Sequence, residues 1–176
     1  MNYSYSLATM TDDDLQHRQA FFATLPRKRM AAGALFFDAA GRIYVVKPTY
    51  RAGWLIPGGA VEANEAPSAA CRREVAEELG IAPPLGRLLC VEYLSEYDGY
   101  TESVQFLFDG GVLNAALAAQ IQLQASELAE GCFVRAEEAS RLLNPKLAVR
   151  VAYALDARTT GSVYYLEDGQ PVGASQ

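Results

Sequence analysis

The chain has 176 residues, of which 51% are hydrophobic and 20% charged, so it can form one domain with a sizeable core and is neither disordered nor fibrous. A formal net charge of −6 argues against a protein that holds nucleic acid through a broad basic surface. Three cysteines without CxxC spacing indicate neither a disulfide framework nor a zinc site. We therefore expect a small or metal-chelated ligand.

The N-terminal stretch MNYSYSLATMTDDD has no basic segment followed by an apolar run. No other stretch reaches about 18 consecutive apolar residues, the minimum for a membrane-spanning helix. These features predict a cytoplasmic protein with no membrane partner.

Residues 11–25 predict a short docking helix. Thr11 suits the N-cap, acids fill the first turn, and Leu15, Phe22 and Leu25 recur at helical spacing. We treat residues 1–26 as an N-terminal helical extension and residues 27–176 as a single domain. The only histidine, His17, has polar neighbours and is interpreted as a solvated position.

Strand-forming residues dominate the next part of the chain. Two such runs, at 31–38 and 42–47, predict a hairpin across a short Ala-Ala-Gly turn. A short strand at 54–56 is expected before a Pro-Gly-Gly turn. A helix is predicted over 67–79, because proline suits its first turn and Gly80 suits the position after its end.

The second half of the chain predicts further strands at 86–97, 102–109 and 131–135. Helical patterns follow at 136–143 and 145–157, and the tail predicts a final strand or hairpin. Strands and helices are mixed without a regular βαβ alternation. This order predicts an α/β protein of the α+β kind, with a mixed sheet covered by helices.

Three acids lie on one face of the helix predicted at 67–79, because Glu74, Glu77 and Glu78 are spaced three and four residues apart. Like charges at this spacing repel, and either a divalent cation or a neighbouring base such as Arg72 or Arg73 would compensate them. Ligation by oxygen alone favours Mg²⁺ or Mn²⁺, which completes its shell with water and phosphate oxygens. By itself the pattern is more often a solvated charged face.

The context of these acids is more specific. Residues 59–81 fit the spacing G-x5-E-x7-R-E-U-x-E-E-x-G-U, where U is a bulky aliphatic residue, at every specified position. This pattern resembles the Nudix box of the Nudix hydrolase superfamily. The resemblance implies the Nudix fold, a mixed β-sheet sandwiched between helices. Many members have glycine where this chain has Asn64, and asparagine tolerates the left-handed backbone of such a turn.

The resemblance also implies roles within the box. Glu74, Glu77 and Glu78 resemble the family's catalytic metal ligands, which the carbonyl of Gly59 is expected to join, with Mg²⁺ or Mn²⁺ as the cofactor.

Outside this ligand set, Glu65 and Arg73 resemble the family's structural ion pair. That pairing would hold the arginine beside the acids without neutralising them.

The reaction that the resemblance implies is attack of water on a phosphorus of a nucleoside diphosphate linked to another moiety. The substrate is then a nucleotide, a dinucleoside polyphosphate, ADP-ribose or a nucleotide sugar. The general base stays open: Glu77 or Glu78 could serve, or a glutamate of a later loop. There Glu127 is a slightly better candidate than Glu130, and either could be an ordinary surface acid.

Cationic and aromatic side chains just before the box are candidates for substrate binding, because an aromatic plane can stack on a base and a cation can hold phosphate. These candidates are Lys47, Tyr50, Arg51 and Trp54, although the tryptophan could equally belong to the core. The basic triplet 27–29 is interpreted as solvated, or with one member reaching a phosphate.

Tyr97 follows the box by about 16 residues. In the family, a tyrosine near this position is associated with diadenosine polyphosphate hydrolases, so it is a further substrate-binding candidate. Strands are rich in tyrosine for other reasons as well.

Two other functions fit the same box. One is a non-catalytic Nudix-fold sensor or interaction module that binds a nucleotide, although non-enzymatic relatives commonly lose box acids that this chain keeps. The other, an RNA-processing hydrolase, is disfavoured by the acidic balance. A homodimer would be unsurprising in this family.

Overall fold

The computed structural model describes residues 11–173, which form eight strands and five helices. The strands are β1 (Arg29–Phe37), β2 (Ile43–Pro48), β3 (Gly58–Ala60), β4 (Leu88–Leu94), β5 (Ser103–Val112), β6 (Leu128–Val134), β7 (Tyr164–Glu167) and β8 (Gln170–Pro171). The helices are α1 (Asp12–Thr24), α2 (Pro67–Leu79), α3 (Ala115–Ala118), α4 (Ala136–Leu142) and α5 (Pro145–Thr160).

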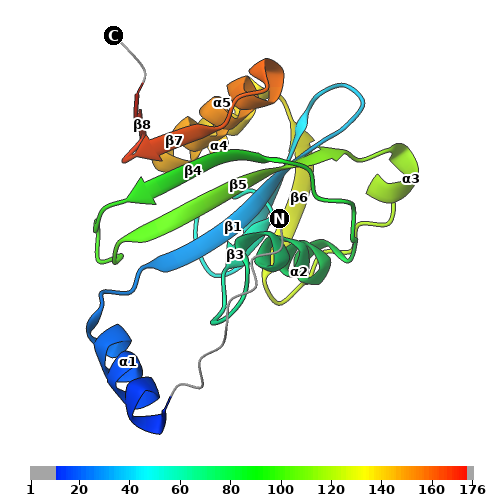
Figure 1. The fold of residues 1–176 in the computed structure, drawn as a ribbon. Helices are drawn as coiled ribbons and strands as arrows, with labels where there is room; N and C mark the ends of the chain where they lie inside the picture. The colour runs from blue at the N-terminus through cyan, green and yellow to red at the C-terminus, as the bar shows by residue number, and fades with distance from the viewer. Residues whose placement is uncertain (1–10, 174–176) are drawn as a thin grey trace, which may run out of the picture.

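All eight strands belong to one mixed sheet, in the order β6-β2-β1-β5-β4-β7-β8 with β3 also paired to β1 (Figure 1). The pairs β1–β5 and β4–β7 are parallel, and the other pairs are antiparallel. The predicted hairpin of β1 and β2 is joined only near its turn, where Phe37 pairs with Ile43. Beyond that point the two strands diverge, which leaves room for β3 beside β1.

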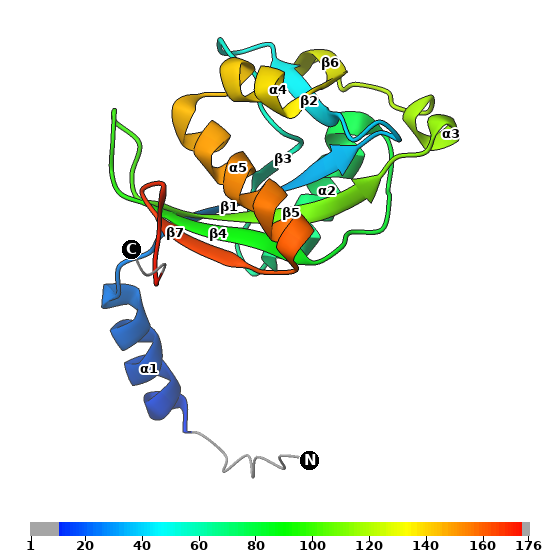
Figure 2. The same ribbon diagram turned by 90° about the horizontal axis from the view of Figure 1, so that it is seen from above.

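Helices cover both faces of this sheet. The alternation of side chains along a strand sends Leu35 of β1 into a core with α4 and α5, and its neighbour Phe36 into a second core with α2. Figure 2 shows the resulting layers, with α5 and α2 on opposite sides of the strands. The predicted mixed sheet sandwiched between helices is confirmed.

The ends of α2 agree with their predicted signals. Pro67 occupies the first turn, and Gly80 ends the helix in the left-handed conformation at φ 67°. Asn64 also has a positive φ, 61°, as the turn before the helix requires.

The predicted short strand at 54–56 is wrong. Trp54 and Leu55 form only isolated bridges, and the strand lies four residues later, at Gly58–Ala60. Glycine usually signals a turn, but here it permits close packing of strands: a Cβ on Gly58 would lie 2.3 Å from the carbonyl oxygen of Ala32.

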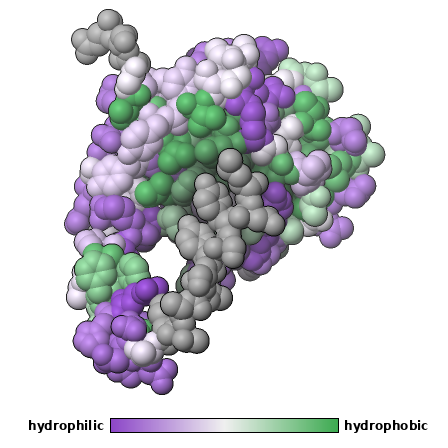
Figure 3. Space-filling model, viewed as in Figure 1, coloured by the Kyte–Doolittle hydropathy of each residue, from purple (hydrophilic) through white to green (hydrophobic). Residues whose placement is uncertain are grey.

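The helix predicted at 11–25 forms, but it does not dock. Thr11 caps α1 as expected, and no residue of the helix is buried. Figure 1 shows α1 apart from the sheet, and Figure 3 shows a hydrophobic area on it. The exposed apolar side chains in and just after α1 are Leu15, Phe21, Phe22 and Leu25. Within residues 11–173, no helix is long and apolar enough to cross a membrane.

Candidate active site

Packing of α2 on the sheet places the carboxylates of its box. The apolar side of the helix is buried as predicted, through Cys71, Val75 and Leu79. Glu78, one residue before the last of these, is drawn inward with them and is only 7% exposed. Its Oε2 accepts a hydrogen bond from the backbone N–H of Gly58, at 2.8 Å. The helix is thereby fixed to β3 through a carboxylate.

Burial and like charges make Glu78 a weak acid. Burial is the main cause that raises its pKa to about 7, and the carboxylates of Glu74, Glu127 and Glu77 add repulsion. The N–H of Gly58 opposes this shift without cancelling it. Negative charge is therefore concentrated at the contact of α2 with β3, where a cation would be favoured.

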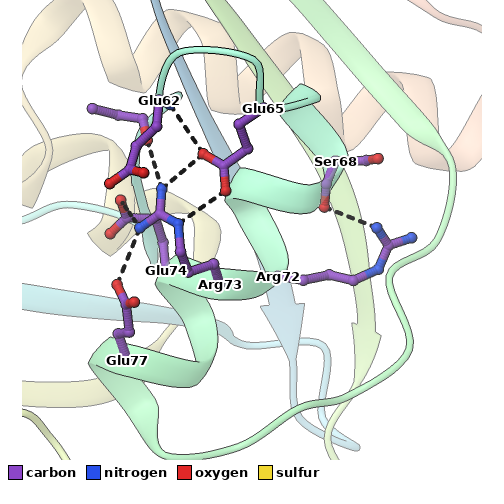
Figure 4. A network of polar contacts seen from close by, with 8 residues as sticks. Glu62, Glu65, Ser68, Arg72, Arg73, Glu74 and Glu77 are labelled. Atoms are coloured by element: carbon purple, nitrogen blue, oxygen red, sulfur yellow. Dashed lines mark hydrogen bonds and ion pairs between the residues drawn. The ribbon is translucent and has the colours of Figure 1, made fainter.

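Arg73 ties the loop before α2 to the helix (Figure 4). Its Nε and Nη2 donate to the two carboxylate oxygens of Glu65, both at 2.9 Å, and Nη2 also donates to the carbonyl of Ala60 at 3.0 Å. These bonds, with one from the N–H of Glu62, lower the pKa of Glu65 to about 2. The pair joins Glu65 to the helix and to β3 at once.

The expectation that Arg73 leaves the box acids alone is wrong. Its Nη1 donates to Oε1 of Glu74 at 2.9 Å and to Oε2 of Glu77 at 3.1 Å (Figure 4). A guanidinium has five N–H donors in a planar fork, so one side chain can bind three carboxylates. Glu77 is the most solvated of the three, with a half-exposed side chain.

In the arrangement described, no group of three or more His, Cys, Asp or Glu side chains within residues 11–173 is placed to hold a metal ion. The protein's own donors occupy these acids instead, since Arg73 holds Glu74 and Glu77 while Gly58 holds Glu78. The donor set still fits Mg²⁺ or Mn²⁺, because it consists of carboxylates, and because burial, with the repulsion of the neighbouring acids, already disfavours ionisation of Glu78.

Gly59 lets a carboxylate approach the backbone of β3. A Cβ at this position would lie 2.4 to 2.6 Å from the carboxylate atoms of Glu74, closer than side chains can stand. Any larger residue would therefore displace Glu74. This close approach is the local reason for glycine at the first position of the box.

A cleft of about 410 Å³ begins at β3 and runs between β1, β5 and the start of α5. Gly58 and Gly59 form part of its wall, so the cleft adjoins the contact between β3 and the acids of α2. Among residues 11–173, no aspartate or glutamate lines it. Its cations and aromatic rings are Arg29, Arg51, Lys146, Arg150, Tyr50, Tyr97, Tyr100 and Phe106.

The predicted substrate-binding residues separate into two groups. Tyr50, Arg51 and Tyr97 line the cleft. Lys47 and Trp54 do not: Trp54 packs against the core beside α4 and α5, and the Nζ of Lys47 lies 5.9 Å from its ring centroid. Of the two predictions for Trp54, substrate binding or a place in the core, the place in the core describes its position.

The two candidates for a general base in the later loop differ as well. Glu130 forms an ion pair of 2.8 Å with Lys47. Glu127 is close enough to Glu78 to contribute to the rise in its pKa. Its carbonyl accepts a hydrogen bond from the N–H of Thr49, which fixes the loop beside β2.

Sequence reasoning missed two residues of the cleft, Lys146 and Arg150 of α5. Arg29 also lines it, and it belongs to the basic triplet in which one member was considered for phosphate binding. Nothing in the local sequence distinguishes Arg150 from an ordinary solvent-exposed cation of a helix. The available signal was the spacing of the helix, which turns positions 146 and 150 to one side.

Comparison with known proteins agrees with this geometry. The NUDIX domain family matches residues 27–156. The MutT protein of Methanosarcina mazei Go1 has a similar structure, with a TM-score of 0.62 and 22% identity over 77% of this chain and 98% of that chain. The NUDIX domain of Shewanella oneidensis NrtR, crystallised with ADP ribose, gives a TM-score of 0.66 at 16% identity over 86% of this chain and all of that one.

The chain belongs to the NUDIX domain family, and its fold is that of the family. Among curated proteins, diphosphoinositol polyphosphate phosphohydrolase 2 of Rattus norvegicus is 56% identical over 36 residues. That stretch covers 20% of this chain and 20% of the relative, so the chain spans about a fifth of the curated relative it matches. Family and phosphohydrolase relatives together support the predicted class of Nudix pyrophosphohydrolases.

Proposed function

We propose that this protein hydrolyses a diphosphate linkage, with a divalent metal, in a nucleoside diphosphate or a similar compound linked to another moiety. The observation that carries the proposal is the contact of β3 with α2. There the acids of the box meet one wall of a cleft that is lined with cations and aromatic rings, and no carboxylate of the described residues lines that cleft. Anionic substrate and acidic ligands are thereby brought together, which only a cation between them stabilises.

The metal would be held by Glu74, Glu77, Glu78 and the carbonyl of Gly59. Mg²⁺ or Mn²⁺, when bound there, supplies charge neutralisation for the diphosphate and makes water a better nucleophile. Arg73 has to release Glu74 and Glu77 for this, while its two bonds to Glu65 keep it in place.

The cleft would position the remainder of the substrate. Arg51 can hold a phosphate, and Tyr50 and Tyr97 offer planes on which a base or sugar can stack. We assign the general base to Glu127, which lies near Glu78 but has no part in the bonds of Arg73. Glu78 is the alternative, since its raised pKa suits proton transfer near neutral pH.

The relatives support a diphosphate substrate without naming it for this chain. One is named for diphosphoinositol polyphosphates, and one structural neighbour binds ADP ribose. We propose a substrate of this wider class, a cytoplasmic location, and residues 27–176 as the catalytic domain. The second candidate function is a sensor that binds such a compound without cleaving it. It is favoured by the ion pairs of Arg73 with two of the proposed metal ligands, Glu74 and Glu77.

The test is a product screen with the purified protein and Mg²⁺ or Mn²⁺. Nucleoside triphosphates, ADP-ribose, nucleotide sugars, diadenosine polyphosphates and a diphosphoinositol polyphosphate are the substrates, and EDTA is the control. Cleavage of one class within its diphosphate, abolished by EDTA, is the expected result. Tight binding without cleavage of any compound would instead support the sensor.

A further inference from the structure

A buried ion pair lies at the end of the cleft away from β3. Glu92 of β4 is completely buried, and the side chain of Arg150 in α5 is 9% exposed. The Nε of Arg150 donates to Oε2 of Glu92 at 2.5 Å. Burying two charges costs more desolvation energy than most pairs return, so such a pair adds little stability compared with apolar residues of the same size. Its position suggests a role in orienting the arginine.

The pair leaves most of the guanidinium available. Apart from its bond to Glu92, the Arg150 side chain has no hydrogen bond to residues 11–173, and it lines the cleft. Because Nε is used, the two terminal nitrogens remain as a planar pair of donors. Such a pair matches two oxygens of a phosphate group.

The surroundings of Arg150 favour an anion. Lys146 lies one turn earlier on α5 and also lines the cleft, with its Nζ 4.5 Å from the ring centroid of Tyr97 and 3.4 Å from Asp168. Arg29 donates to the hydroxyl and carbonyl of Thr101 and has no carboxylate partner among the described residues. The first turn of α5, a helix of 16 residues, adds its positive end.

The sheet register separates this cationic group from the acidic helix. Glu92 pairs with Gln105, Gln105 with Ala31, and Ala31 with Ala60 of β3. Three interstrand spacings therefore lie between Glu92 and Ala60, roughly 14 Å. A diphosphate at the box acids cannot at the same time occupy the donors of Arg150, so those donors need a second group on the same molecule.

We propose that Arg150, oriented by Glu92 and assisted by Lys146, binds a phosphate monoester remote from the scissile diphosphate. The substrate class is then a diphosphate compound whose sugar or polyol carries a further phosphate. This inference rests on the proposed function for the scissile end. Recognition of the remote phosphate depends on residues of α5 and β4, so binding measurements can test it without any turnover.

The first experiment measures binding by calorimetry in EDTA, so that neither metal nor cleavage contributes. The probes are AMP, adenosine 3′,5′-bisphosphate and inositol hexakisphosphate. We expect the wild-type protein to bind adenosine 3′,5′-bisphosphate about tenfold more tightly than AMP, because one phosphate gains charge-assisted hydrogen bonds. Preference for inositol hexakisphosphate over the bisphosphate would assign the phosphate to a polyol, and the reverse would assign it to a nucleotide.

The variants keep the test independent of folding. Glu92→Gln combined with Arg150→Met removes the subsite without leaving a buried unpaired charge, and it should lose the preference for the bisphosphate. Arg150→Lys keeps the charge but not the planar donors, so this variant should keep only part of the preference for the bisphosphate. The matched control is Arg158→Met, a cation of the same helix that pairs with Asp109 and does not line the cleft, and it should bind as the wild type does.

Equal affinity of the wild type for AMP and the bisphosphate overturns the subsite, and so does a double variant that keeps the preference. Failure of the proposed function is a different result: no cleavage with Mg²⁺ or Mn²⁺ while the preference in EDTA persists. Circular dichroism on each variant confirms that it is folded.

Discussion

The two ends of the cleft use charge in different ways. At the β3 end, acids from one short segment of α2 crowd together, and Arg73 binds three carboxylates, including Glu77, whose side chain is half-exposed. At the α5 end, one buried carboxylate orients one cation, and the partners come from residues 58 positions apart. Carboxylates with exposed, exchangeable partners can be released to bind a metal. A cation held by a buried carboxylate keeps one orientation and suits recognition of a substrate group. In our proposals, hydrolysis therefore takes place at the β3 end of the cleft and substrate recognition at the α5 end.

The largest effect is expected at the acidic end. Glu78→Gln should lower turnover by about a thousandfold or more, because it removes a proposed metal ligand while an amide can still accept the bond from Gly58. Steady-state kinetics with saturating Mg²⁺ measure this effect. Glu62→Gln, an exposed acid of the loop before α2, is the control and should retain activity. Wild-type turnover in the Glu78 variant would place the chemistry elsewhere.

Loss of one partner at the other end should act on stability instead. Glu92→Ala leaves the cation of Arg150 buried and unpaired, and should lower the free energy of unfolding by about 3 kcal/mol. Urea denaturation measures it. Replacing both residues by leucine should recover most of the loss. A double replacement as unstable as the single one would contradict the view that this pair contributes little net stability.

A pH series should reveal the strain at the acidic end. The folded pKa of Glu78 is about 7 against an ordinary 4.5, so the folded state loses stability as pH rises through this window, up to about 3 kcal/mol. In EDTA the midpoint of thermal unfolding should fall by roughly 6 °C between pH 5 and pH 8. Mg²⁺ should raise the midpoint more at pH 8 than at pH 5, because protons compete for the same carboxylate.

Glu78→Gln serves as the control for that series, since it removes the titrating group and should flatten the response. The opposite shift of Glu65, to about 2, contributes stability that is lost only as pH falls below 4.5, outside this range. A midpoint in EDTA that rises between pH 5 and pH 8 would contradict the assignment.

Neighbouring arginines of α2 provide a matched pair. Arg73→Met should lower the free energy of unfolding by about 2 kcal/mol, because it removes the bonds to Glu65 and to the carbonyl of Ala60. Arg72→Met should change it by less than about 0.5 kcal/mol, since Arg72 is exposed and, among residues 11–173, donates only to the carbonyl of Ser68. Denaturant titration of both variants measures the contrast, and equal losses would refute it.

The smallest effect is expected outside the cleft. Phe22→Ser should change the stability of the protein by less than about 0.5 kcal/mol, because α1 has no buried residue and Phe22 is 56% exposed. The same chemical change in the core, Phe36→Ser, is the comparison and should be severely destabilising. A large loss in the Phe22 variant would mean that residues 1–26 are not a separate extension.

Much of the fold could be predicted because its signals are local. The bounds of α2 agree at both ends, since proline and a left-handed glycine act within one turn of the helix. The strand at Gly58–Ala60 was missed because its glycines allow β1 to pack closely against it, and no neighbouring residue in the sequence indicates that contact. The docking of α1 was also wrong, since helical spacing of apolar residues does not specify a surface to receive them.

By itself, the sequence determined the family, the class of fold and the acids of α2, because the box is contiguous and helical geometry converts its spacing into one face. Only the tertiary structure decided which cation binds those acids, which candidates line the cleft, and that Arg150 and Glu92 meet. These outcomes depend on side chains brought together from distant strands and helices. Their pairing follows from packing and register, which act between segments and leave no mark within either one.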